Sequence, residues 1–204
     1  YGIRLDRDRC AEYRDIVANK MAETTDSLYQ QIGYKFGLSS SSPDLGKILY
    51  EDMKLPVINV TDSGAPSTDA DTLKQLADEY DDAEFLKDLL SYRKMEKVKN
   101  TYLNNWLKMS ARDGCIHCSF LQAGTATGRL SSSNPNLQNV PFALKELGLN
   151  LKSLFLPDDG YQLGELDISN AEMRTLCAYS QDEALIRAFN EGQDLHCLTG
   201  AAIS

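Results

Sequence analysis

The chain has 204 residues, of which 42% are hydrophobic and 25% are charged, and its net charge is -9. This length allows a real core in one large domain or two small ones. No apolar run approaches the ~20 residues of a membrane span, and the charged N-terminus is unlike an export signal, so we expect a soluble cytoplasmic protein without membrane partners.

The distribution of charge is more informative than its sum. The net charge is -8 over residues 1–86, +5 over 87–112 and -6 over 113–204. Global acidity lowers non-specific association with nucleic acids, whereas a local basic belt is what phosphate binding requires. The sequence is therefore compatible with a nucleic-acid partner that binds at residues 87–112.

The first 80 residues predict a helical scaffold. Asp6 can cap a helix that runs to about Ile32, and Gly33 follows it. Ser42 and Pro43 are typical of the start of a short helix, which the 55–56 Leu-Pro pair ends. The polar run 61–68 predicts a flexible, disordered loop, from which Ser67 or Thr68 caps the next helix.

A long amphipathic helix is predicted from about residue 83 to residue 109. Its apolar positions predict one buried side, and they are Leu86, Leu89, Leu90, Met95, Val98, Tyr102 and Trp106. The same helix carries six basic residues, which are Lys87, Arg93, Lys94, Lys97, Lys99 and Lys108. A solvated helix face is the simpler interpretation, and the excess of basic over acidic residues favours phosphate contact as the alternative.

The closest cysteines, Cys115 and Cys118, lie in a segment with strand-like alternation. Five cysteines in such a protein indicate reduced thiols rather than a disulfide framework. A zinc site at Cys115, His117 and Cys118 would need a second ligand cluster, which the neighbouring sequence lacks.

The segment 125–141, TATGRLSSSNPNLQNVP, is the most unusual in composition. Its small, hydroxylated and amide residues predict an ordered loop against a polar surface. The Arg129 guanidinium can donate two hydrogen bonds to a phosphate. The side-chain amides of Asn136, Gln138 and Asn139 can both donate and accept hydrogen bonds, as contacts with sugars and the minor groove require. A loop that caps its own backbone is the alternative.

The segment 163–176, LGELDISNAEMRTL, predicts a short strand over 163–166 followed by a helix over about 170–178. Asp167 would stand where the strand ends and before the helix begins. This position suits a metal-ligating acid, although most aspartates at such a position are turn or cap residues. Asp158 and Asp159 predict a hairpin turn. Ser180 with Glu183 predicts a capping box for the next helix, which Gly192 can end before Asp194 caps a last one.

Two of these segments carry a resemblance to family A DNA polymerases, the DNA polymerase I family. Residues 125–141 resemble the family's primer-template contact motif, and LDISNAEMRTLCAYSQDEALIRAFNEGQDLH (166–196) resembles its motif A region. The first 110 residues resemble the thumb more weakly. The resemblance implies an α+β fold, in which a helical thumb precedes the first part of an antiparallel-sheet palm with flanking helices, an incomplete right-hand polymerase core.

The resemblance implies a role for individual residues of the motif A region. Asp167 would bind two catalytic Mg2+ ions, joined by the backbone carbonyl of Ile168. Ser169, Asn170 and Glu172 would face the incoming nucleotide, with Glu172 excluding a ribose, and His196 would lie near the triphosphate. Arg174 would be a structural ion-pair residue.

The resemblance also implies contacts with primer-template DNA. The matching residues lie on the thumb helix and in the polar loop, and they are Lys97, Lys99, Asn100, Tyr102, Thr127, Arg129, Asn136, Gln138 and Asn139. Domain limits would be 1–112 for the thumb, 113–180 for the N-terminal palm and 181–204 for the start of the fingers.

The chain departs from the family pattern at Ile168, Asn170 and Ala171, where the family commonly has Tyr, Gln and Ile. The small Ala171 would enlarge the nucleotide pocket, and Glu165 would share the strand face of Asp167. Neither the family's fingers-helix signature nor its His-Asp-Glu motif occurs, so the chain resembles only the first half of a polymerase core.

The resemblance implies template-directed transfer of nucleotides from dNTPs to a primer 3'-hydroxyl. It also implies that these 204 residues alone do not extend a primer, and that the fingers and remaining palm come from the same gene or a second chain in a bacterial or virus-infected cell. The alternatives are a non-catalytic DNA-binding protein on a degenerate scaffold and a single-subunit RNA polymerase relative, which Glu172 disfavours.

Overall fold

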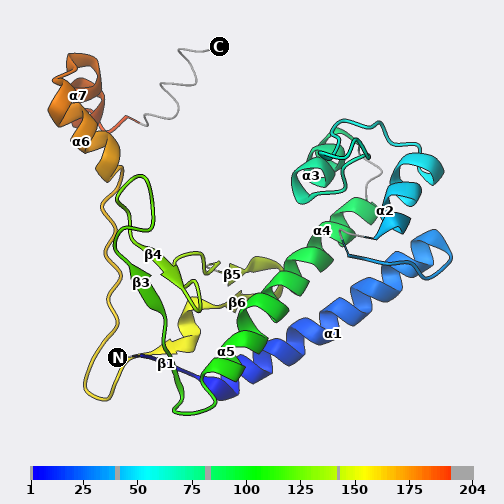
Figure 1. Ribbon diagram of the computed structural model, residues 1–204, viewed down its shortest axis with the longest axis horizontal. Coiled ribbons are helices and arrows are strands. Elements are labelled where there is room, and N and C mark those ends of the chain that lie inside the picture. Colours follow the sequence, from blue (N-terminus) through cyan, green and yellow to red (C-terminus); the bar gives the residue numbers. More distant parts are fainter. Residues whose placement is uncertain (1, 40–41, 81–83, 142, 194–204) are drawn as a thin grey trace. The chain divides into compact units, whose positions relative to one another are not determined.

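The computed structural model describes residues 2–39, 42–80, 84–141 and 143–193 (Figure 1). The chain divides into two compact units, Tyr1–Tyr161 and Gln162–Ser204. Helices and small antiparallel sheets together confirm the predicted α+β class. Among the described residues, no helix has the length and apolar character to cross a membrane.

Helix α1 (Arg7–Ile32) starts and ends where its sequence predicts. The Asp6 side chain accepts a hydrogen bond from the Arg9 amide at 3.1 Å, and Gly33 ends the helix in the left-handed conformation, at φ +87°. This backbone conformation has little steric cost for glycine, which lacks a Cβ atom. The buried positions recur mostly at three-to-four-residue spacing and are Cys10, Val17, Met21, Thr24 and Leu28.

A second helical run lies antiparallel to α1 and consists of α4 (Glu84–Lys97), the π-helical turn η2 (Val98–Leu103) and α5 (Asn104–Met109) (Figure 1). At one end Arg7 donates to the Leu107 carbonyl at 2.8 Å. At the other end Gln31 donates to Asp88 at 2.8 Å. The single long helix predicted here is confirmed, but its middle turn is wider than an α-helix.

Two hydrophobic clusters hold the first unit together. One contains Trp106, Val98 and Leu103, and it joins the start of α1 to the strands. The other joins the end of α1 to α2 (Pro43–Lys47), the π-helical turn η1 (Ile48–Asp52), α3 (Ala70–Glu79) and the start of α4. The helical run that contains η2 contributes residues to both clusters, so it connects the two hydrophobic cores of this unit.

The strands are short and antiparallel. Strand β1 (Ile3–Leu5) lies between β2 (Cys115–Ile116) and β7 (Phe155–Leu156). Strand β3 (Ser119–Leu121) pairs with β4 (Ser131–Ser133), and β5 (Ala143–Leu144) with β6 (Leu149–Asn150). Two 3-10 turns, η3 (Lys145–Leu147) and η4 (Lys152–Leu154), connect the last strands.

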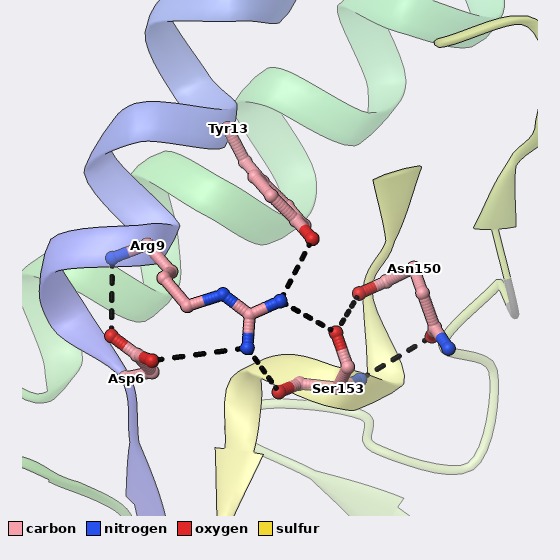
Figure 2. Close-up of polar contacts among 5 residues, drawn as sticks. All are labelled: Asp6, Arg9, Tyr13, Asn150 and Ser153. Carbon is pink, nitrogen blue, oxygen red and sulfur yellow. Dashed lines mark hydrogen bonds and ion pairs between the residues drawn. The ribbon is translucent and has the colours of Figure 1, made fainter. Parts of the chain in front are cut away.

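A polar network fixes the start of α1 against η4 (Figure 2). The Arg9 guanidinium donates to the Tyr13 hydroxyl at 3.1 Å and to the Ser153 hydroxyl at 3.3 Å, and it lies 3.9 Å from Asp6. Ser153 in turn donates to the Asn150 carbonyl at 2.8 Å. Because Arg9 is exposed and its partners are only half-buried, each contact adds little stability, and their combined effect is to orient two segments far apart in sequence.

The helix caps predicted between residues 60 and 70 are wrong. Asp69, rather than Ser67 or Thr68, caps α3, and its carboxylate accepts from the Thr72 amide at 2.7 Å. The hydrogen bond from the Thr72 amide is the largest of several that lower the pKa of the Asp69 carboxyl group. The 61–68 run is not disordered but forms a hydrogen-bonded turn, in which the Thr61 amide donates to the Ala65 carbonyl at 2.8 Å.

The second unit contains α6 (Ala171–Ser180) and α7 (Glu183–Asn190). The expected strand over 163–166 is not formed. The capping box at Ser180 is also wrong, because Asp182 caps α7 and accepts from the Ala184 amide at 2.9 Å. Gly192 follows α7 at φ +68°, as predicted for a helix end. Asp194 and His196 lie outside the described residues.

Candidate nucleic-acid interface and acidic motif

One open pocket gathers four of the predicted DNA contacts. It has a volume of 590 Å³ and lies in the first unit between the helical run and the polar loop. Lys97 and Tyr102 come from the helices, and Asn136 and Asn139 come from the loop. The remaining lining residues are Thr101, Asn105, Met109, Asn134 and Pro135. A cation and several amide groups thus converge from segments that are about 30 residues apart.

Tyr102 joins the two walls of this pocket. It is 7% exposed, and its hydroxyl donates to the Asn139 backbone carbonyl at 2.8 Å. Its ring packs edge-on against Trp106, with the centroids 5.5 Å apart. This residue therefore holds the loop against the helix, and it has little free surface for a ligand.

The loop is largely organised by its own side chains. Ser132 is buried and donates to the Asn136 side-chain oxygen at 3.2 Å, which also accepts from the Gln138 amide at 3.0 Å. The Gln138 side chain donates to the Leu130 carbonyl at 3.1 Å. The self-capping interpretation is therefore correct for these contacts, and it leaves a preformed surface rather than a flexible one.

The start of the loop is held in the same way. The Thr125 hydroxyl donates to the Arg129 carbonyl at 2.8 Å and lies 3.3 Å from the Thr127 hydroxyl. Gly128, between them, has φ +74°. Thr127 and Arg129 are both exposed but do not line the pocket described above.

The basic belt does not act as one surface. Arg93 is partly buried and donates to the Thr68 carbonyl, and its burial lowers its pKa. Lys94 pairs with Glu146 at 2.7 Å, and this hydrogen bond lowers the pKa of the glutamate. Lys97 remains exposed at the pocket. Part of the predicted phosphate-binding charge is thus engaged by other residues of the protein.

Lys99 and Asn100 do not line the pocket with Lys97. The pKa of Asp15 on α1 is lowered mainly by a hydrogen bond from Arg14, and the positive charge of Lys99 adds to this effect. Lys99 is therefore close to α1. Asn100 is exposed and accepts a hydrogen bond from the Asn104 side chain at 3.3 Å.

In the second unit, Asp167 lies in an extended, exposed segment that leads into α6. Its neighbours Leu166 and Ile168 are 94% and 66% exposed. Asn170 precedes the helix in the left-handed conformation, at φ +54°, and its side chain makes no capping bond. Glu172 lies in the first turn of α6. Asp167, Ile168, Ser169, Asn170 and Glu172 are thus adjacent along the chain.

Arg174 does not show the predicted ion pair within the described part of the chain. Its Nε donates to the Ser169 carbonyl at 2.9 Å, and its guanidinium lies 4.7 Å from the centre of the Phe189 ring. The first contact fixes the backbone before α6, and the second packs α6 on α7. Arg174 is therefore a structural residue by a different mechanism.

The donors near Asp167 suit a hard cation only in part. A carboxylate and a backbone carbonyl are oxygen ligands of the kind that Mg2+ prefers. However, no group of three His, Cys, Asp or Glu residues that could hold a metal occurs among the described residues. The segment therefore offers part of a ligand set.

Sequence reasoning missed Thr101, Asn105, Met109, Asn134 and Pro135 as pocket residues. Thr101 follows Lys97 by four residues, a spacing that places side chains on one side of a helix, so it could have been identified. Asn105 and Met109 lie two and three such steps from Lys97 and would drift away from that side in a regular α-helix. Asn134 and Pro135 lie in a loop, where helix spacing does not apply.

Comparison with known sequences decides the family. Residues 7–204 match the profile described as DNA polymerase family A. The chain belongs to this family. It is 39% identical over 203 residues to DNA polymerase I of Caldicellulosiruptor bescii, and 37% identical over 202 residues to the thermostable DNA polymerase I of Thermus aquaticus. These matches cover 99% and 98% of the chain but only 23% and 24% of the two relatives.

The fold of this family A chain also agrees with a solved polymerase structure. The POL domain of Pol1 from M. smegmatis, in complex with DNA primer-template and dNTP, matches it with a TM-score of 0.81 and 36% sequence identity. The match covers 96% of this chain and 34% of that one. The chain is therefore similar to a portion of a polymerase domain.

Proposed function

We propose that this chain is the thumb and N-terminal palm portion of an enzyme that transfers nucleotides from dNTPs to a primer 3'-hydroxyl on a DNA template. The observation that carries the proposal is the convergence of Lys97, Asn136 and Asn139 on one pocket. The solved relative holds primer-template DNA and dNTP, which supports this choice of ligands.

Each wall of the pocket has a different part in binding DNA. Lys97 contributes a positive charge that neutralises a phosphate of the backbone. Asn139 provides an amide group that can donate to or accept from sugar and minor-groove atoms. Asn136 contributes its amide hydrogens as donors, because its side-chain oxygen already accepts from Ser132 and Gln138. Tyr102 acts through its hydrogen bond to the Asn139 carbonyl, so it positions the loop rather than touching DNA. Lys99, Asn100, Thr127, Arg129 and Gln138 do not line the pocket, and we propose them as DNA contacts by resemblance alone.

The second unit supplies the chemical part of the proposed function. Asp167 and the Ile168 carbonyl would hold Mg2+, which stabilises the negative charge that develops during phosphoryl transfer. Ser169, Asn170 and Glu172 would contact the incoming nucleotide, and Glu172 would occupy the space of a ribose 2'-hydroxyl. His196 has the corresponding role near the triphosphate by resemblance alone.

The proposed division follows the resemblance, with a thumb over 1–112, an N-terminal palm over 113–180 and the start of the fingers from 181. The chain spans 22–24% of the length of curated relatives. We propose that the remaining fingers and palm complete the enzyme.

Replacing Lys97 with alanine tests the DNA-binding part of the proposal. The 204-residue chain is titrated with a primer-template duplex at several salt concentrations. Loss of one phosphate contact should weaken binding by about 10-fold at low salt and reduce the slope of log K against log salt by about 1.

Lys74→Ala is the matched control, because Lys74 is exposed on α3 and does not line the pocket. It should leave both affinity and salt slope close to those of the unchanged chain. Equal effects of the two substitutions would show that binding depends on net charge alone and would contradict the assignment of the pocket.

A further inference from the structure

Four residues of one wall of the pocket form a row along the helical run. Lys97, Thr101, Asn105 and Met109 lie four residues apart, and all four line the pocket. In a regular α-helix, each step of four residues advances about 40° beyond a full turn. Over three steps, a row of this kind would rotate by about 120° and could not keep facing one loop.

The π-helical turn η2 explains why the row keeps to one wall of the pocket. Between Val98 and Leu103 the helix is wider, and the Asn104 amide donates to the Lys99 carbonyl five residues earlier. Four residues are less than one full turn of such a helix, so the row drifts in the opposite direction there. The two drifts offset each other, and Asn105 comes to lie in line with Lys97.

Asn105 differs from its neighbour Asn104 in what its side chain contacts. The Asn104 amide donates to Asn100 at 3.3 Å and does not line the pocket. The Asn105 side chain is exposed in the pocket and makes no hydrogen bond to other residues of the described ranges. Its amide donor therefore points to a ligand surface that already has the charge of Lys97 at one end and loop amides opposite.

We infer that Asn105 is a further DNA contact, whose amide donates to a backbone phosphate one step along the strand from the phosphate held by Lys97. The occupant is the sugar-phosphate backbone of one DNA strand, which is continuous and can follow the polar side chains of Lys97, Thr101 and Asn105 along the helix. The π-helical turn is the feature that makes this contact possible. The inference rests on the proposed DNA-binding function of the pocket.

Charge substitutions at Asn105 test the inference in the 204-residue chain, with a primer-template duplex as the probe. Asn105→Asp should weaken binding by about 10-fold, because it places a carboxylate against a phosphate. Asn105→Lys should tighten binding and make the salt slope steeper by about 0.9, the value for one added phosphate contact.

Asn19→Asp is the matched control, since it makes the same change at an exposed asparagine of α1 that does not line the pocket. It should alter the affinity by less than about 2-fold at moderate salt, where exposed charges are screened. Equal weakening by the two aspartates, or an unchanged salt slope for Asn105→Lys, would overturn the role of Asn105. If Lys97→Ala also left DNA binding unchanged, the assignment of the pocket to DNA binding would be wrong. If Lys97→Ala weakened binding but the Asn105 substitutions did not act as expected, only the role of Asn105 would be wrong.

Discussion

Replacing Asp167 with alanine, in a polymerase polypeptide that contains this chain, is expected to lower nucleotide incorporation by at least about 1000-fold. Removing a carboxylate ligand forfeits charge stabilisation worth several kcal/mol, and each 1.4 kcal/mol corresponds to about tenfold in rate. Primer-template affinity should change little, because the proposed DNA pocket belongs to the first unit. Single-turnover incorporation of a dNTP and duplex titration measure the two effects separately.

Asp158→Ala provides the control for this substitution. Asp158 is an exposed aspartate in the turn that the Tyr161 amide closes at 3.0 Å, and its carboxylate is not among the proposed ligands. Its replacement should leave incorporation unchanged. An Asp167→Ala enzyme that still incorporates nucleotides at the normal rate would show that the metal assignment is wrong.

Replacing Trp106 with alanine should produce the largest loss of stability in the first unit. The side chain is fully buried, and its ring packs between Tyr102 and Phe155, with centroid distances of 5.5 and 5.1 Å. Truncating a buried aromatic residue costs about 3–5 kcal/mol in unfolding free energy, because it removes apolar burial and leaves a cavity. Urea unfolding followed by circular dichroism measures the change.

Trp106→Phe separates ring packing from the polar atom of the indole. The indole nitrogen is buried and has no hydrogen-bond partner among the described residues. Phenylalanine removes this unsatisfied donor and retains most of the apolar contact, so its cost should stay below about 2 kcal/mol. If Trp106→Phe lowered the unfolding free energy as much as Trp106→Ala, the edge-on contacts with Tyr102 and Phe155 would contribute little to stability.

The helices were more predictable than the strand before Asp167, for a physical reason. A helix such as α1 satisfies its backbone hydrogen bonds within one segment, so Asp6 and Gly33 were enough to locate its ends. A strand needs a neighbouring edge for its backbone groups. The 163–166 segment is exposed and unpaired with any described strand, so its local sequence alone does not make it a strand.

Errors at the helix caps have a local cause. Ser67 and Asp69 are both residue types that can cap a helix, and the Asp69 carboxylate is the group that accepts from the Thr72 amide. The serine instead donates to the Asp69 carboxylate at 2.7 Å. The same competition places Asp182 rather than Ser180 at the start of α7. Sequence patterns identify candidates for a cap, and geometry selects one.

The candidate site was predictable in composition but not in arrangement. Lys97, Asn136 and Asn139 were selected from separate segments, and they meet at one pocket. The different surroundings of Lys99 follow from helix geometry, since residues two apart point to opposite sides of a helix. The use of Lys94 in an ion pair with Glu146 depends on tertiary packing, which a helix pattern does not contain.

The wide turn between α4 and α5 also affects how the length of this segment can vary. A π-helical turn accommodates one residue more than an α-helical turn of the same height. Deleting one residue between Val98 and Leu103 would therefore convert it into an α-helical turn and leave α5 in nearly the same orientation. Trp106 would then keep its place beside Phe155, whereas the same deletion in the regular turns of α4 would rotate all that follows by about 100°. The helix therefore tolerates the loss of one residue better at its wide turn than in the regular turns before it.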